Sequence, residues 1–212
     1  MKKIGFMGGT FEPIHVGHIL LGQWAMEEYG LDEIWFVPTG LSYLKEGRTM
    51  LPADVRLELT RLAVEDTPGF KVSDVEAKRP GRTYTVETLE ELRRDYPEDH
   101  FYFICGADSL EYMENWYLPE GVLSNCEIIA ACRNGSDTDH LKQVAEDLIR
   151  KLPIQSTYPD GFGGRIHIMS FPNFEISSTK IRDRVRQGKS IRYLVPEAVR
   201  IEIESKGYFH ER

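Results

Sequence analysis

The chain has 212 residues with a formal net charge of −8, and 41% of its residues are hydrophobic and 28% charged. This length and composition are typical of one globular α/β domain, which we expect to cover residues 1–212. The acidic balance argues against the basic face that nucleic-acid binding requires, so an anionic ligand would need a local cluster of positive groups.

Cysteine usage and hydropathy predict a cytoplasmic protein. The three cysteines, Cys105, Cys126 and Cys132, form no C-x-x-C pair, which is typical of free thiols in a reducing compartment. Glycine, glutamate and proline soon interrupt the apolar run that follows Met1, so this run does not resemble a signal peptide. No stretch is long and apolar enough to span a membrane, and we expect no membrane partner. The sequence leaves open whether the chain forms a homo-oligomer.

Strands and helices alternate along the chain. Apolar runs predict strands at 4–7, 34–37, 70–75, 101–105, 127–131 and 165–171. Helical spacing predicts helices at 16–29, 53–66, 85–96, 139–152, 177–187 and 197–206, with shorter helical turns at 109–113 and 119–123. This alternation predicts an α/β fold with a doubly wound, mostly parallel sheet between two helical layers, a three-layer sandwich. A helical portion follows from about residue 177 onward.

The stretch 8–18, G-G-T-F-E-P-I-H-V-G-H, lies between the first predicted strand and the first predicted helix. Gly8 and Gly9 lack a Cβ, so we expect a sharp turn there that lets the backbone approach a ligand closely. His15 and His18 are three residues apart and point the same way on a helix. Because a helix N-terminus already favours anions, two imidazoles at that position predict a polyphosphate site.

This stretch has three alternative interpretations. A dinucleotide-binding dehydrogenase would need G-x-G-x-x-G and an acidic residue after the second strand, where Pro38 and Thr39 stand instead. A zinc site would need a further histidine or cysteine nearby or H-E-x-x-H, and neither is present, so we expect no metal ligand from the protein. A non-catalytic nucleotide sensor is the third alternative.

A second candidate stretch, 176–182, begins the helix predicted at 177–187. Its Ser177, Ser178 and Thr179 offer hydroxyls and amides at a helix N-terminus. Arg182 lies one turn beyond Ser178 and can donate a forked pair of hydrogen bonds to phosphate oxygens. Taken alone, the serines and threonine could be a simple helix cap. In a doubly wound sheet both stretches fall at the carboxyl edge, so we expect two helix N-termini to face one ligand.

Together the two stretches resemble the two signatures of the nucleotidyltransferase superfamily, G-T-F-D/E-P-x-H-x-G-H and I-S-S-T-x-I-R. From Lys3 to the last helix, the chain resembles the bacterial nicotinate mononucleotide adenylyltransferase family. The resemblance implies a Rossmann-like nucleotidyltransferase fold. It also implies adenylyl transfer from ATP to nicotinate mononucleotide, giving nicotinate adenine dinucleotide and pyrophosphate in NAD biosynthesis. An adenylyltransferase for nicotinamide mononucleotide or phosphopantetheine is the alternative.

The same resemblance implies which residues bind ATP and act on it. The implied catalytic residues are His15, His18, Lys45 and Arg182. The implied ATP-binding residues are Gly8, Gly9, Thr10, Phe11, Gly106, Asp108, Arg133, Ile176, Ser177, Ser178 and Thr179. Mg²⁺ is expected on the ATP phosphates, held mostly by phosphate oxygens and water. The sequence offers no obvious covalent nucleophile, and positioning with charge stabilisation can support this reaction.

The acceptor is a pyridine mononucleotide by this resemblance, and the implied acceptor-binding residues are Lys45, Thr83, Tyr84, Thr85, Tyr112 and Trp116. Residues 83–85 match a stretch whose backbone amides meet the pyridine carboxylate, and Trp116 matches a tryptophan that stacks on the ring. A core position is the alternative for Trp116. The chain departs from the family loop P-P-H-K, because Ser42, Tyr43 and Leu44 replace the prolines and the histidine, whereas Lys45 retains the lysine. This departure bears on the acceptor's identity and on any closing motion of the loop.

Overall fold

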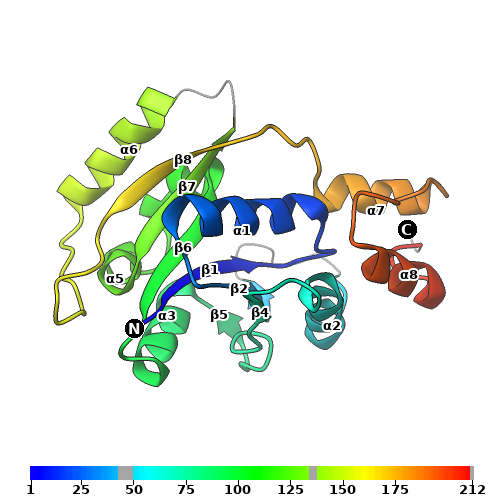
Figure 1. Cartoon of the computed structure of the whole chain (residues 1–212), viewed down its shortest axis with the longest axis horizontal. Coiled ribbons are helices and arrows are strands. Elements are labelled where there is room, and N and C mark those ends of the chain that lie inside the picture. The colour runs from blue at the N-terminus through cyan, green and yellow to red at the C-terminus, as the bar shows by residue number, and fades with distance from the viewer. Residues whose placement is uncertain (43–49, 134–137, 211–212) are drawn as a thin grey trace.

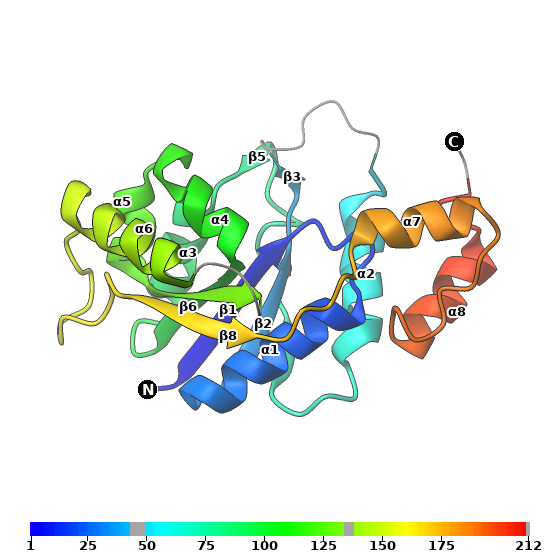
Figure 2. The same cartoon turned by 90° about the horizontal axis from the view of Figure 1, so that it is seen from above.

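A six-stranded sheet forms the centre of the computed structural model, which describes residues 1–42, 50–133 and 138–210. Its strands are β1 (Lys3–Gly9), β2 (Glu33–Pro38), β4 (Phe70–Val72), β6 (His100–Gly106), β7 (Glu127–Arg133) and β8 (Ile166–Phe171). They lie in the order β4-β2-β1-β6-β7-β8, and every neighbouring pair is parallel. A separate parallel ribbon joins β3 (Leu41–Ser42) to β5 (Arg82–Thr83), beside the carboxyl end of β2 (Figure 2).

Helices cover both faces of the sheet (Figures 1 and 2). One hydrophobic cluster includes side chains of α1 (Val16–Tyr29), α2 (Ala53–Val64), α7 (Ser178–Arg186) and α8 (Glu197–Lys206). The other includes side chains of α3 (Thr85–Asp95), α4 (Ala107–Tyr112), the 3₁₀ turn η2 (Met113–Asn115), α5 (Pro119–Asn125) and α6 (Thr138–Lys151).

The sheet itself separates these two clusters. On β6, Phe101 and Phe103 face the second cluster, whereas Tyr102 and Ile104 face the first, as the two-residue period of a strand requires. This arrangement confirms the three-layer, doubly wound fold expected from the alternation of strands and helices. The three cysteines are buried and free. Among the helices of the described residues, none combines the length and apolarity needed to cross a membrane.

The strand order determines where a ligand can bind. In chain order, the six strands of the main sheet lie as 3-2-1-4-5-6, and the direction of winding reverses between β1 and β6. In sheets of this kind, ligands bind outside the carboxyl ends of the strands at the point of reversal. The chain leaves β1 at Gly9 and β6 at Gly106, so the segments after these residues border that crevice.

One local expectation is wrong. Gly8 and Gly9 do not form a sharp turn but are the last residues of β1, paired in register with Val37 and Pro38 of β2. Because β2 continues to Pro38, the ladder extends through both glycines. The chain reverses instead at Phe11, whose φ of 44° lies in the left-handed region that side chains rarely adopt. Its ring is only 2% exposed, and this packing holds the unusual backbone in place.

Candidate active site

Two stacked histidines begin α1. His15 is the N-cap of the helix, with an extended backbone, and its N–H donates a hydrogen bond to Nδ1 of His18 over 3.2 Å. The two imidazole rings lie 3.6 Å apart between centroids and are tilted by only 20°. Gly17 permits this stack, because a Cβ there would lie 3.1 Å from Nδ1 of His15. The edge of the Phe11 ring supports His18, with 5.0 Å between the ring centroids.

The environment sets the charge of the His15 ring and the tautomer of a neutral His18 ring. Burial lowers the pKa of His15 to about 4, so this imidazole is neutral at neutral pH. Nδ1 of His18 accepts the His15 amide proton, so a neutral His18 carries its own proton on Nε2. His18 can therefore present an Nε2–H donor to a phosphate oxygen.

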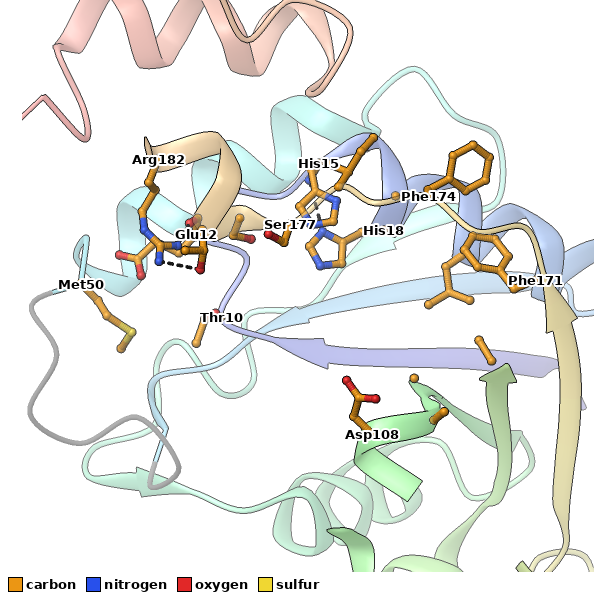
Figure 3. Close-up of a pocket in the computed structure, with 18 of the residues that line it drawn as sticks. Thr10, Glu12, His15, His18, Met50, Asp108, Phe171, Phe174, Ser177 and Arg182 are labelled. Atoms are coloured by element: carbon orange, nitrogen blue, oxygen red, sulfur yellow. Dashed lines mark hydrogen bonds between the residues drawn. The ribbon is translucent and has the colours of Figure 1, made fainter. Parts of the chain in front are cut away.

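The second signature, residues 176–182, is hydrogen-bonded directly to the first, residues 8–18. Ser178 Oγ donates to the carbonyl of Pro13 over 2.9 Å. Arg182 Nη1 donates to the carbonyl of Glu12 over 2.7 Å (Figure 3). Nη2 of Arg182 donates to Thr179 Oγ1 over 3.1 Å, which fixes the plane of the guanidinium. Segments 165 and 170 residues apart thus form one wall.

The larger of two cavities at this edge of the sheet has a volume of about 990 Å³ and is lined by both signatures. The N-caps of α1 and α7, His15 and Ser177, both border it, so two helix N-termini face the same space. Figure 3 shows Asp108 across the cavity from the histidines. The predicted residues that line it are Thr10, His15, His18, Gly106, Asp108, Ile176, Ser177, Ser178, Thr179 and Arg182.

A smaller cavity of about 390 Å³ adjoins the first. It is bordered by the predicted acceptor residues Thr83, Thr85 and Trp116. Trp116 is half-buried against Phe103, with ring centroids 5.6 Å apart, so it belongs to the core and borders a cavity as well. The predicted ATP residues Gly8, Gly9 and Phe11 line this cavity and not the larger one. Both cavities share Thr10, His18, Leu21, Gly106 and Ser178.

Two other predicted residues that the structure describes, Tyr84 and Tyr112, border neither cavity. Tyr112 is 51% exposed at the end of α4, and Tyr84 is the N-cap of α3 with its ring on Tyr117, 4.6 Å between centroids. Lys45 lies outside the described residues. Arg133 ends β7, but its side chain is likewise outside the described part of the chain.

Several residues that build the site are not among those predicted from the sequence. Arg56 is 1% exposed and donates hydrogen bonds to four carbonyls, those of Thr10, Thr39, Gly40 and Leu51. The sequence pattern that could have identified Arg56 is its position on α2, because Arg56, Thr60 and Ala63 follow each other at helical spacing on the buried face of that helix. Glu76 borders the smaller cavity, and Arg186, Phe171 and Phe174 border the larger one.

The carboxylates of the larger cavity bear on metal binding. Glu12 and Asp108 are the carboxylates among the residues that line this cavity. Glu12 already accepts a hydrogen bond from the Leu51 amide over 2.6 Å. Within residues 1–42, 50–133 and 138–210, no three histidine, cysteine or acidic side chains cluster to hold a metal ion. This donor set suits a cation that is held mainly by phosphate oxygens and water.

Comparison with known proteins gave concordant matches. A family model for cytidylyltransferase-like proteins matches residues 6–184. A probable nicotinate-nucleotide adenylyltransferase of Lachnoclostridium phytofermentans is 41% identical over 99% of this chain and 100% of its own length. One of Exiguobacterium sibiricum is 42% identical over 95% of this chain and 96% of its own. The fold resembles Plasmodium falciparum nicotinic acid mononucleotide adenylyltransferase complexed with NaAD, with a TM-score of 0.76, 16% identity, and coverage of 99% and 98% of the two chains.

Proposed function

The chain belongs to the cytidylyltransferase-like family and, within it, to the nicotinate-nucleotide adenylyltransferases, and from this premise we propose that its two adjoining cavities bind ATP and nicotinate mononucleotide. The reaction is adenylyl transfer from ATP to nicotinate mononucleotide in NAD biosynthesis. The observation that carries the assignment to this site is the direct bonding of the two signatures at one cavity. That cavity shares His18 and Ser178 with a second one lined by Thr83, Thr85 and Trp116.

The chemistry requires positioning more than a covalent nucleophile. A phosphate oxygen of the mononucleotide attacks the α-phosphorus of ATP, a new P–O bond forms, and the bond to the bridging oxygen of pyrophosphate breaks. The ATP phosphates occupy the larger cavity, and the acceptor's ring occupies the smaller one beside Trp116. Because the two cavities meet at His18 and Ser178, the attacking oxygen and the α-phosphorus meet there.

The side chains stabilise charge as the bond to pyrophosphate breaks. Nε2–H of His18 and the amides that begin α1 and α7 donate to the phosphate oxygens. Arg182, already oriented by Glu12 and Thr179, holds the leaving pyrophosphate. Neutral His15 stacks on His18 and fixes its ring without adding a charge.

A divalent cation fits this proposal as a companion of ATP. Mg²⁺ would neutralise charge on the phosphates, and Asp108 is a carboxylate on the wall of the cavity that we assign to them. Lys45, the residue of the family loop that this chain retains, keeps its proposed role at the acceptor phosphate.

Pyrophosphate release from ATP tests the proposal directly. The purified chain is given ATP and Mg²⁺ with nicotinate mononucleotide, nicotinamide mononucleotide or phosphopantetheine, and initial rates are compared. We expect the highest kcat/KM with nicotinate mononucleotide. A preference for nicotinamide mononucleotide would refute the proposed acceptor. No pyrophosphate release with any of the three compounds would refute the proposed enzymatic activity.

A further inference from the structure

Glu76 is a buried carboxyl beside the acceptor cavity. It lies between β4 and β5, is 3% exposed, and borders the smaller cavity together with Thr83, Thr85 and Trp116. A carboxyl in such a place is costly unless its oxygens are hydrogen-bonded. Burial raises the pKa of Glu76, so the group resists carrying a negative charge at this position.

Glu76 belongs to a chain of hydrogen-bonded side chains that connects the segment before β5 to helix α3. Thr88 Oγ1, on the first turns of α3, donates to Glu76 Oε1 over 2.8 Å. Arg79 Nη1 donates to the same Thr88 hydroxyl over 3.0 Å, and Arg79 Nη2 donates to Glu91 Oε2 over 2.7 Å. The chain Glu76–Thr88–Arg79–Glu91 therefore fixes the N-terminal half of α3 against the segment that precedes it.

The backbone of Glu76 also meets the exit of β2. A Cβ on Gly40 would lie 2.6 Å from the carbonyl oxygen of Glu76 and 3.3 Å from Cγ2 of Thr83. Only a glycine allows the three segments to approach so closely. Three walls of the acceptor cavity, near residues 39, 76 and 83, thus converge at Glu76.

We propose that Glu76 is a positioning residue that holds residues 83–85 and the start of α3 as the anion-accepting wall of the acceptor site, and so favours an acceptor with a carboxylate on its ring. This inference rests on the proposed function. The amides that begin α3 carry the positive end of a helix of 11 residues. A carboxylate on the acceptor gains from those amides only if Thr85 stays in place, which the bond from Thr88 to Glu76 ensures.

The test compares steady-state kinetics of Glu76→Ala, Glu76→Gln and a matched control, Glu127→Ala. Glu127 is also 3% exposed and accepts a side-chain hydrogen bond, from His167 over 2.7 Å. It is the first residue of β7 and therefore lies at the amino ends of the strands, away from the carboxyl ends that border the cavities. For Glu76→Ala we expect KM for nicotinate mononucleotide to rise about tenfold, with KM for ATP and kcat within about twofold. The ratio of kcat/KM for nicotinate mononucleotide to kcat/KM for nicotinamide mononucleotide should fall in the same variant.

The other two variants separate positioning from general destabilisation. Glu76→Gln keeps an oxygen that accepts from Thr88, so we expect it to restore KM to within about threefold of the parent chain. Glu127→Ala should lower stability without moving KM for the acceptor. Equal KM values in Glu76→Ala and the parent, or equal KM shifts in Glu76→Ala and Glu127→Ala, would overturn the inference. If the parent chain itself failed to use nicotinate mononucleotide, the proposed function would fail first.

Discussion

Replacing Arg56 with methionine should be among the most damaging single changes in this protein. The guanidinium is buried and donates to the carbonyls of Thr10, Thr39, Gly40 and Leu51 over 2.6–3.1 Å. These carbonyls belong to the segments that leave β1 and β2 and to the one that precedes α2. Arg56 thus joins three connections at the carboxyl edge of the sheet, and no other single side chain could replace all four donors.

The magnitude follows from two opposing contributions. Hydrogen bonds that involve a charged group contribute about 1.5–3 kcal/mol each, and their loss leaves buried carbonyls without donors. Against this, burial lowers the pKa of Arg56, which shows that its surroundings partly oppose the charge. Relief of that desolvation offsets part of the loss. We expect Arg56→Met to lower the free energy of unfolding by about 4 kcal/mol, within the range for breaking a buried hydrogen-bond network around a charged group.

Urea unfolding followed by tryptophan fluorescence and by far-UV circular dichroism measures this loss. The matched control is Arg61→Met on the same helix, where the arginine side chain is 49% exposed and pairs with Glu58 at 3.6 Å and Asp74 at 3.7 Å. Such surface pairs contribute roughly 0–1 kcal/mol. If Arg56→Met cost less than about 1 kcal/mol, or no more than the control, our account of the four carbonyls would be refuted.

Further predictions concern the histidines, Arg182 and the cation. We expect His18→Ala to lower kcat about a hundredfold through loss of one preorganised donor, measured by pyrophosphate release; an unchanged rate would exclude it from the site. Arg182→Gln should raise KM for ATP and weaken inhibition by pyrophosphate, whereas an effect on the acceptor's KM alone would contradict its assignment. Because burial lowers the pKa of His15 from 6.5 to about 4, the unfolded chain binds a proton between these values that the folded chain does not. Stability should therefore fall by up to about 3 kcal/mol as the pH drops from 7 to 4. His15→Asn should flatten this part of the curve in urea unfolding, and an identical slope would count against the buried neutral ring. Chelation with EDTA should abolish pyrophosphate release and excess Mg²⁺ should restore it; full activity without divalent cations would contradict the proposed role.

The sequence predicts the architecture well, because alternating apolar strands and amphipathic helices have few ways to pack. Both signatures follow predicted strands, and the carboxyl ends of parallel strands share one edge, so their meeting could be expected. The prediction of a turn at Gly8 and Gly9 was wrong for a nonlocal reason, because the length of β1 depends on how far β2 extends beside it. The two-residue strands β3 and β5 are too short to give a periodic signal.

Arg56 and Glu76 were harder to predict than the histidines. The partners of Arg56 include backbone carbonyls 16, 17 and 46 residues away, and any residue type supplies a carbonyl. The partner of Glu76 is a threonine 12 residues away, in a helix that hydropathy alone explains. A motif records side chains that meet a ligand, whereas these two residues hold the segments that carry the motif.

The bonds from Ser178 to Pro13 and from Arg182 to Glu12 have a consequence for biosynthesis. When β8 has been translated, every strand of the six-stranded sheet has been synthesised, but the residues that form one side of the nucleotide site have not. The nascent protein therefore cannot complete this site until Arg182 has been translated. A truncation after Phe171 and before Ser178 would leave a polypeptide that has every strand of the main sheet and cannot complete the site.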